Sequence, residues 1–401
     1  MRQVRHRHCV VIGAGVLGAA VAARLAGTGM HVTLLDQAQP GHGTSRWSFA
    51  WVNSNDKGPR LYHELNQAGI RAWAELAPDL DGPAWYRLVG NLELAAPDTT
   101  ELAARVNRLT EWGYPARLID TAEASQIEPS LRPVARDAMA AWFPGEGYLL
   151  TEPLIARLVT YATSRGAVLL TGEPGRVVGF DTSPIRVRTA VGTLEADEVV
   201  CCAGRWASEL AALAGAAPVP LEGWAEPGAT APELVVRAGP VAAGGPLRVV
   251  HAPEIYLRPH SGGLLHLEAP DAAVDLHTPD RQLRRWAAEL LHRARRTVRG
   301  LDHATVVDYQ VCVRPMPADG QSIVGRLPGA EWLYVAVTHS GVTLAAHLSR
   351  LITAELTAGL PTADALAAEL TAGTAAAELA PYRPGRFSAL QRPGRSAGPA
   401  G

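Results

Sequence analysis

Three glycines near the N-terminus have the spacing of a turn that binds phosphate. Gly13, Gly15 and Gly18 follow the apolar segment 9–12 and lead into a run of small residues over 19–26. In such a turn the first glycine permits a sharp bend, the second lets a diphosphate approach the backbone, and the third lets a helix pack closely. The helix N-terminus adds N–H groups and a partial positive charge. The pattern therefore predicts a strand, a diphosphate-binding turn and a helix.

An acidic residue completes this unit. A second apolar segment over 31–35 ends in Asp36, whose carboxylate suits the hydroxyls of a ribose and disfavours a 2′-phosphate. The unit predicts binding of NAD or FAD rather than NADP, and it does not separate these two cofactors. The alternative is a glycine-rich turn without a ligand. The residues expected to contact the cofactor here are Gly13, Ala14, Gly15, Val16, Leu17, Gly18 and Asp36.

Composition limits the classes of protein that can carry this unit. The chain has 401 residues, which predicts two or three domains, and 47% of them are hydrophobic, enough for substantial cores. The formal net charge of −2 argues against a nucleic-acid binder and against a polybasic membrane-surface protein. Four cysteines without Cys or His metal-ligand spacing predict no disulfide framework, no metal site and a cytoplasmic location. The apolar run 9–23 contains three glycines and is followed by Arg24, so we expect neither a signal peptide nor a membrane span.

Two later segments repeat the strand–turn–helix pattern. The first is an apolar strand ending at about residue 202, which enters a turn at Ala203 and Gly204 before a helical segment. The second is an apolar strand over 332–337, followed by a polar turn that contains Gly341 and by a helix to about residue 358. Both segments are expected beside the first unit, because they have the same local pattern.

Taken together, these pieces resemble the D-amino-acid-oxidase-like superfamily of FAD-dependent oxidoreductases, which includes glycine oxidase, sarcosine oxidase and D-amino-acid dehydrogenase. The resemblance covers roughly residues 8–388. The matching pieces, in the order of the family, are the Gly13–Asp36 unit, the Ala203–Gly204 turn, and residues 256–259, 313–320 with 324–325, and 339–344.

The resemblance implies an α/β fold in which a Rossmann-like FAD-binding domain is interleaved with an antiparallel β-sheet substrate domain. The FAD-binding domain is expected over 1–80, 145–220 and 310–388, and the substrate domain over 81–144 and 221–309. Residues 389–401 are rich in Pro, Gly and Ser, which predicts a disordered tail.

The resemblance also implies a reaction: oxidation of a carbon–nitrogen bond in a small amine or amino acid. A hydride passes from the substrate carbon to flavin N5 and leaves an imine, and the electrons go on to oxygen or another acceptor. Arg314 matches the family arginine that binds the substrate carboxylate, and Tyr256 and His339 are expected to face the substrate. The alternatives are a surface arginine, an ordinary strand aromatic and a structural histidine. Arg258, two residues after Tyr256, is a second anchor or, as we slightly prefer, a structural residue.

Further cofactor contacts follow from the same resemblance. The loop over 41–57 is expected to pass under the adenosine diphosphate and along the flavin ring, where Trp47 and Trp51 form a wall or simply pack. The helix that follows His339 is expected to point at the flavin pyrimidine oxygen. The residues concerned are Thr44, Ser45, Arg46, Val177, Ala203, Gly204, Trp206, Cys312, Gly341, Val342, Thr343 and Leu344.

Two positions matter in the comparison with sarcosine oxidase. That enzyme has a lysine near flavin N5 that assists the reaction with oxygen, whereas the only lysine here, Lys57, lies outside the corresponding strand. It also links FAD through a cysteine at the position of Cys312, which here is either a thioether link or a free buried thiol. Rival functions are 2-hydroxy acid oxidation, tailoring of a larger metabolite, and a non-catalytic flavin-binding subunit.

Overall fold

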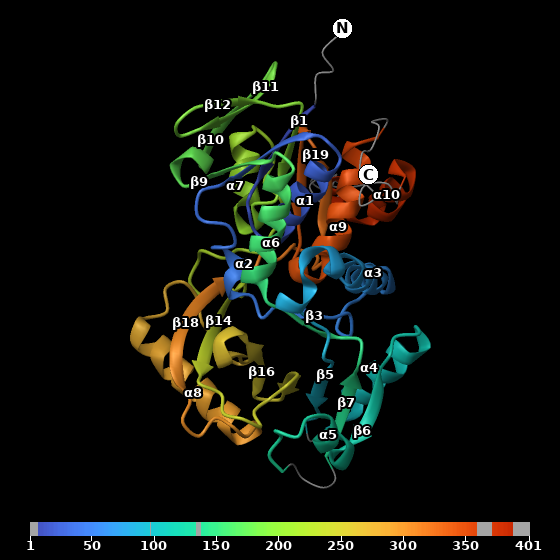
Figure 1. The fold of residues 1–401 in the computed structure, drawn as a ribbon, viewed down its shortest axis with the longest axis vertical. Coiled ribbons are helices and arrows are strands. Elements are labelled where there is room, and N and C mark those ends of the chain that lie inside the picture. The colour runs from blue at the N-terminus through green and yellow to red at the C-terminus, as the bar shows by residue number, and fades with distance from the viewer. Residues whose placement is uncertain (1–6, 97, 134–137, 359–370, 388–401) are drawn as a thin grey trace, which may run out of the picture.

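The computed structural model describes residues 7–96, 98–133, 138–358 and 371–387. The predicted tail over 389–401 lies outside the described residues. The chain has a mixed α/β fold with four sheets, of six, three, eight and three strands. In Figure 1 the upper part contains stretches from the blue, green and red regions of the chain, and the lower part contains cyan and yellow-to-orange stretches. Each part is therefore built from segments that are far apart in the sequence.

The six-stranded sheet has the order β19-β20-β13-β1-β2-β9 and is parallel except for its edge strand β19. Its strands are β1 (His8–Ile12), β2 (His31–Asp36), β9 (Val168–Thr171), β13 (Glu198–Cys201), β19 (Ile323–Leu327) and β20 (Ala330–Val337). Because β1, β2, β13 and β20 run in the same direction, their carboxyl ends meet at one edge of the sheet. Ligands bind at this edge in open α/β sheets.

Both faces of this sheet are covered, which explains why its strands are apolar at nearly every position. One face packs against α1 (Val16–Gly27), α6 (Thr151–Ser164) and α9 (Gly341–Leu356). The other packs against α7 (Ala207–Leu213) and the three-stranded sheet of β10 (Val177–Thr182), β11 (Ile185–Thr189) and β12 (Thr193–Glu195). The helix α1 is buried along its whole length, so the small residues of this segment fit a central helix that has neighbours on every side.

The eight-stranded sheet has the order β18-β14-β17-β16-β15-β5-β7-β6. Its strands are β5 (Asn91–Leu94), β6 (Arg117–Asp120), β7 (Met139–Phe143), β14 (Pro232–Gly239), β15 (Val249–Ala252), β16 (Ile255–His260), β17 (Leu264–Glu268) and β18 (Thr305–Val313). The pairing is antiparallel except between β5 and β15, which are parallel. The expectation of an antiparallel sheet is therefore wrong at this pair, where a long crossover rather than a hairpin joins the two strands.

Alternation along these strands gives the eight-stranded sheet two different faces. One face is apolar, for example at Leu234, Leu257 and Leu267, and α8 (Asp280–Thr297) packs against it. The opposite face carries Glu233, Glu268 and other polar residues, which line a cavity together with His339, just after β20. The helices α4 (Thr100–Glu111) and α5 (Thr121–Ile127) lie near β6, and β18 runs across the predicted domain boundary at residue 310 and pairs with β14.

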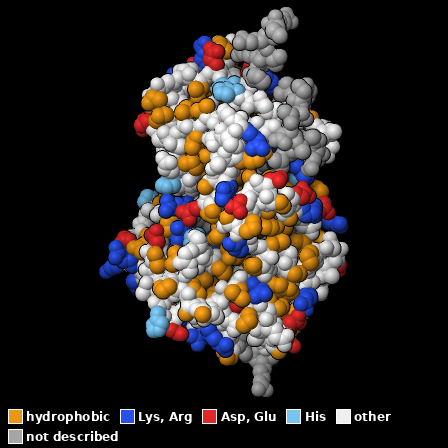
Figure 2. Space-filling view, in the orientation of Figure 1, with side chains coloured by type: hydrophobic (Ala, Val, Ile, Leu, Met, Phe, Trp, Pro, Cys, Tyr) orange, Lys and Arg blue, Asp and Glu red, His pale blue; other side chains and the backbone are white. Residues whose placement is uncertain are grey.

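Short elements lie between the two large sheets (Figure 1). They are α2 (Thr44–Trp47) and the small sheet of β3 (Trp51–Val52), β4 (Tyr86–Arg87) and β8 (Gly147–Leu149). The helices α3 (Arg60–Leu76) and α10 (Ala372–Leu379) pack against α9. Among the described residues, no helix is both long and apolar enough to cross a membrane. Acidic and basic side chains are interspersed on the face shown in Figure 2.

Candidate functional site

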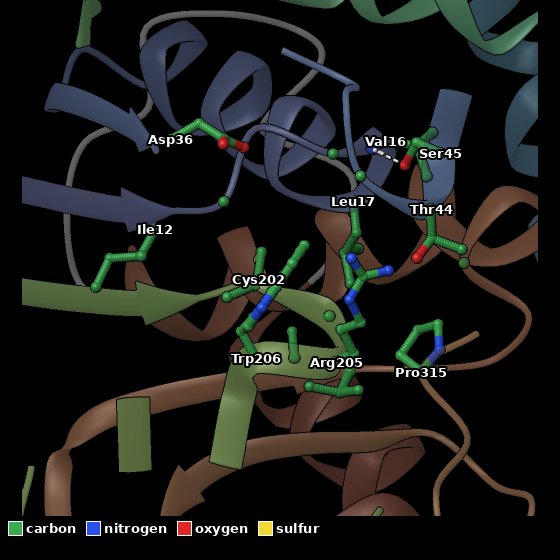
Figure 3. Close-up of a pocket in the computed structure, with 18 of the residues that line it drawn as sticks. Ile12, Val16, Leu17, Asp36, Thr44, Ser45, Cys202, Arg205, Trp206 and Pro315 are labelled. Carbon is green, nitrogen blue, oxygen red and sulfur yellow. Dashed lines mark hydrogen bonds between the residues drawn. The ribbon is translucent and has the colours of Figure 1, made fainter. Parts of the chain in front are cut away.

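A cavity of about 270 Å³ lies at the carboxyl edge of the six-stranded sheet. The ends of β1, β2, β13 and β20 and the N-terminus of α1 contribute to its wall, and Figure 3 shows part of its lining. Many of the predicted cofactor residues come together here, although they lie up to about 330 positions apart in the chain. They are Gly13, Gly15, Val16, Leu17, Asp36, Thr44, Ser45, Val177, Ala203, Gly204, Trp206, Gly341 and Val342, and the predicted catalytic residue His339 also lines this cavity.

The glycine turn has the geometry that its sequence predicts. Gly13 has φ +101°, and a Cβ atom there would lie 2.6 Å from the carbonyl oxygen of Cys202, so no other residue fits this backbone. A Cβ atom at Gly18 would lie 1.8 Å from the carbonyl oxygen of Gly13, which shows how closely α1 approaches the turn. The turn therefore presents bare backbone to the cavity.

Asp36 fixes the turn as well as lining the cavity. Its Oδ2 atom accepts a hydrogen bond from the Ala14 backbone N–H at 2.8 Å, and its Oδ1 atom accepts one from the Ala38 N–H at 2.8 Å. Burial raises the pKa of this carboxyl, and the two backbone donors oppose that shift. In Figure 3, Asp36 lies at the opposite end of the cavity from Thr44 and Pro315.

The N-terminus of α1 lacks a capping side chain of its own. Its N-cap residue is Gly15, and the Val16 N–H donates instead to Ser45 Oγ at 3.0 Å, the bond drawn in Figure 3. Ser45 comes from α2, and its carbonyl oxygen accepts from Thr151 Oγ1 at 2.7 Å, which ties α2 to the start of α6. The helix N-terminus thus faces the cavity with N–H groups and a partial positive charge.

A second cavity, of about 280 Å³, adjoins the first. The two share five lining residues: Thr44, Ser48, Pro315, His339 and Val342. The predicted residues Tyr256, Cys312, Arg314 and Thr343 also line the second cavity. His339 stands at the junction. Burial, together with the charges of Lys57 and Arg314, lowers the pKa of its imidazole to about 3, so the ring is neutral.

The polar face of the eight-stranded sheet forms one wall of the second cavity. Register brings Glu233 opposite Cys312 and Tyr256 opposite Glu268 on this face. Burial raises the pKa of Glu268 well above its ordinary value, and the neighbouring Glu233 raises it further. Burial also raises the pKa of Glu233, against the opposing charge of Arg314. Both effects disfavour the charged form of Glu268.

Arg314 lies in this cavity but already has protein partners. Its Nη1 atom is 3.2 Å from Glu233 Oε2, its Nη2 atom donates to the Thr230 carbonyl at 2.8 Å, and its Nε atom donates to the Ala231 carbonyl at 3.1 Å. A guanidinium has five N–H bonds, so two of them have no partner among the described residues. The contacts fix the orientation of the side chain, while Glu233 offsets its charge.

Aromatic rings line part of the second cavity, and a buried carboxyl outside its lining holds one of them. The ring of His251 lies 4.2 Å from Trp51 and 4.5 Å from Tyr256, centroid to centroid. Trp51 Nε1 donates to Glu146 Oε2 at 3.0 Å, and Glu146 is fully buried. Burial raises the pKa of Glu146 to about 7, although several donors to the carboxyl oppose that rise.

Some predicted residues lie elsewhere. Ala14, Gly18, Arg46 and Leu344 line neither cavity. Ala14 and Gly18 act within the turn described above, and Leu344 belongs to the apolar core. Arg46 instead lies with its Nε atom 3.1 Å from Glu152 Oε1 on α6. Arg258 is fully buried, and its guanidinium contacts the carbonyl oxygens of Phe49 and Pro259, which is the structural role preferred for it above.

Sequence reasoning missed several residues of the two cavities. Arg205 lines the first cavity, with its guanidinium 3.9 Å from the centre of the Trp206 ring. Because Arg205 lies between Gly204 and Trp206, which were both predicted cofactor contacts, its position in the sequence could have indicated it. Asp56 and Lys57 line the second cavity and lie in the predicted loop over 41–57, although neither was assigned a role. The charged residues of this cavity that were missed are Glu93, Arg105, Glu233 and Glu268. For these residues the sequence offers no local motif, because they come from separate strands and a helix.

Comparison with known proteins defines the class of this protein. Residues 8–355 match the DAO family, described as FAD dependent oxidoreductase. The chain is 29% identical to glycine oxidase of Geobacillus kaustophilus over 378 residues, which cover 89% of this chain and 95% of that protein. It is 28% identical to monomeric sarcosine oxidase of Streptomyces avermitilis over 214 residues, 50% of this chain and 52% of that one.

Solved structures agree with this result. The structure of glycine oxidase from Geobacillus kaustophilus matches with a TM-score of 0.74 at 25% identity, covering 90% of this chain and 97% of that chain. L-proline dehydrogenase from P. horikoshii matches with a TM-score of 0.75 at 20% identity, covering 97% and 99%, and this likeness concerns the fold alone. The chain belongs to the DAO family of FAD-dependent oxidoreductases. The predicted family, its FAD cofactor and its oxidoreductase class are thereby confirmed.

Proposed function

We propose that this oxidoreductase oxidises the carbon–nitrogen bond of a small amine or amino acid that carries a carboxylate. The observation that carries the proposal is the adjoining of two cavities, one at the glycine turn and one that contains Arg314 and Tyr256. The relatives named glycine oxidase and sarcosine oxidase support an amine as the substrate. The FAD would accept the hydride from the substrate carbon.

The residues of the first cavity fit FAD. The bare backbone over 13–18 and the N-terminus of α1, whose N-cap residue Gly15 has no side chain, suit a diphosphate. Asp36 suits the ribose hydroxyls. A Cβ atom at Gly15 would lie 3.1 Å from Ser45 Oγ and would narrow the space for the diphosphate. We further infer that the segments around the six-stranded sheet form the FAD-binding domain, and that the segments of the eight-stranded sheet form an interleaved substrate domain.

Residues of the second cavity would bind and orient the substrate. The two remaining N–H bonds of Arg314 suit a carboxylate, and Tyr256 adds a hydroxyl and an aromatic wall. His339 at the junction is neutral because of its low pKa, so it would contact the substrate as an uncharged hydrogen-bonding group. Together these groups exclude water from one side of the substrate and hold its reacting carbon toward the first cavity.

An anaerobic reduction screen tests the substrate class. The FAD-loaded protein is mixed without oxygen with small amines, amino acids of both configurations and 2-hydroxy acids, and bleaching of the flavin absorbance is followed. We expect amines that carry a carboxylate to bleach the flavin. Bleaching only by 2-hydroxy acids or only by larger amine metabolites would favour those rivals, and no bleaching by any compound would favour a non-catalytic subunit. Admission of air afterwards shows whether oxygen is the electron acceptor.

A further inference from the structure

Two of the three basic side chains in the second cavity are already paired with glutamates. Arg105 on α4 forms an ion pair with Glu93 on β5, and Arg314 forms one with Glu233 on β14. The third basic side chain is Lys57, the only lysine in the sequence. Within the part of the chain that the structure describes, its ammonium group has no ion pair or hydrogen bond.

The acids of this cavity do not supply a partner for Lys57. Glu93 and Glu233 are occupied by the two arginines, and burial disfavours the charged form of Glu268. The side chain of Asp56 is 73% exposed, and the basic atom found near its Oδ1 is Arg105 Nη1 at 3.9 Å. Lys57 is partly buried and lines the cavity, so its ammonium group can pair with an anion that enters from outside the protein.

The segment that carries Lys57 is held in place. It follows β3 and precedes α3, and the backbone N–H groups of Ser54 and Asn55 donate to Glu146 Oε1 at 3.3 and 3.1 Å. Asn55 Nδ2 also donates to Glu146 Oε2 at 2.9 Å. Because the backbone two residues before Lys57 is anchored to a buried carboxyl, the lysine is directed into the cavity by a fixed base.

Lys57 and Arg314 line the same cavity. Both side chains line the cavity that also contains His339, and the electrostatic effect of both reaches that ring. A carboxylate beside His339 would meet the charge of Lys57 and the two remaining N–H bonds of Arg314. Since Glu233 offsets the charge of Arg314, Lys57 provides the net positive charge at this point.

We propose that Lys57 binds the carboxylate of the substrate and supplies the net positive charge that Arg314, paired with Glu233, does not. This inference rests on the proposed function, since it concerns the substrate of that reaction. It assigns Lys57 as a specificity-determining residue for substrates that carry a carboxylate. A charged hydrogen bond of this kind contributes about 1.5–3 kcal/mol, which corresponds to about 10–100-fold in affinity.

Binding of carboxylate probes tests the role of Lys57 without turnover. Benzoate and acetate are titrated into the FAD-loaded protein, and the dissociation constant is taken from the change in the flavin absorption spectrum. We expect Lys57→Met to weaken binding of both probes by about 10–100-fold and Lys57→Arg to retain most of the affinity. Arg60→Met is the matched control, because Arg60 is exposed and pairs with Glu64 on α3. Benzamide, which has no charge, should bind the wild type and Lys57→Met equally.

The outcomes separate this inference from the proposed function. Equal affinity of the wild type and Lys57→Met for both carboxylates overturns the role of Lys57, and so does a wild-type spectrum that neither carboxylate changes. A parallel loss of affinity for benzamide also overturns it, because such a loss indicates a damaged cavity rather than a missing charge. Failure of the proposed function would appear elsewhere, as a wild-type flavin that no amine bleaches.

Discussion

The buried carboxyl of Glu146 should control the stability of the segment that carries Trp51. Its Oε1 atom accepts from the Ser54 and Asn55 backbone N–H groups and from the Tyr114 hydroxyl at 2.5 Å. Its Oε2 atom accepts from Trp51 Nε1 at 3.0 Å, from Asn55 Nδ2 at 2.9 Å and from Asn91 Nδ2 at 3.3 Å. All six partners are hydrogen-bond donors, so the side chain at position 146 has to accept hydrogen bonds at both of its terminal atoms.

Glutamine cannot accept on both sides. In Glu146→Gln the backbone N–H groups of Ser54 and Asn55 require an acceptor, so the amide oxygen takes the place of Oε1. The amide nitrogen then takes the place of Oε2 and faces Trp51 Nε1. An indole N–H cannot become an acceptor. At pH 5 the wild-type carboxyl is neutral, but its hydroxyl oxygen still accepts a hydrogen bond, which an amide NH2 group cannot do. A buried donor that loses its acceptor costs about 1–3 kcal/mol, so we expect the variant to be about 2 kcal/mol less stable at pH 5.

The size of this difference should depend on pH. The pKa of Glu146 is about 7 in the folded protein against an ordinary value of 4.5. A raised carboxyl pKa stabilises the folded state at low pH, and this contribution is lost as the pH rises from 4.5 through 7. Between pH 5 and pH 8 the wild type should lose about 2.5 kcal/mol relative to the glutamine variant, which closes the gap between them.

Urea unfolding measures both effects. The FAD-loaded wild type and Glu146→Gln are unfolded at pH 5 and at pH 8, with tryptophan fluorescence as the signal. Glu64→Gln is the control, because Glu64 is exposed on α3 and its loss should change stability little at either pH. Equal stability of the wild type and Glu146→Gln at pH 5, or a gap that widens toward pH 8, would refute this reasoning.

Two further predictions concern the cofactor. Asp36→Ala removes the acceptor of the Ala14 and Ala38 N–H groups, so the dissociation constant for FAD in a fluorescence titration should rise by at least about tenfold; an unchanged constant would argue against a role for Asp36 in holding the turn. Burial raises the pKa of the Cys312 thiol above its ordinary value, which makes it a poor nucleophile, so we expect the flavin to stay in the supernatant when the wild type is precipitated with acid. Yellow wild-type pellets beside colourless Cys312→Ser pellets would instead demonstrate a thioether link.

The parts of the site that are local in sequence could be predicted. The glycine turn, Asp36 and the Ala203–Gly204 turn each belong to a single strand–turn–helix unit, where residue type and spacing are enough to indicate backbone geometry. The parallel order of their strands then places them at one edge of the sheet, so the first cavity followed from local patterns.

The second cavity could be predicted only in part. Arg314 and Tyr256 were found through family resemblance, whereas Glu233 and Glu268 lie on strands whose polar positions look like an ordinary solvent-facing side. That face instead lines a cavity together with His339 and the start of α9, a juxtaposition that only long-range packing decides. The pairing of Arg314 with Glu233, and the absence of such a partner for Lys57 among the described residues, depend on the same long-range packing.

The visible absorption spectrum of the purified protein tests the central claim most directly. The protein is incubated with FAD, freed of unbound cofactor and scanned, and FAD released by heat is quantified against the protein. The cavity at the glycine turn predicts a yellow protein that retains about equimolar FAD. A colourless protein that retains no FAD after this treatment would contradict the account.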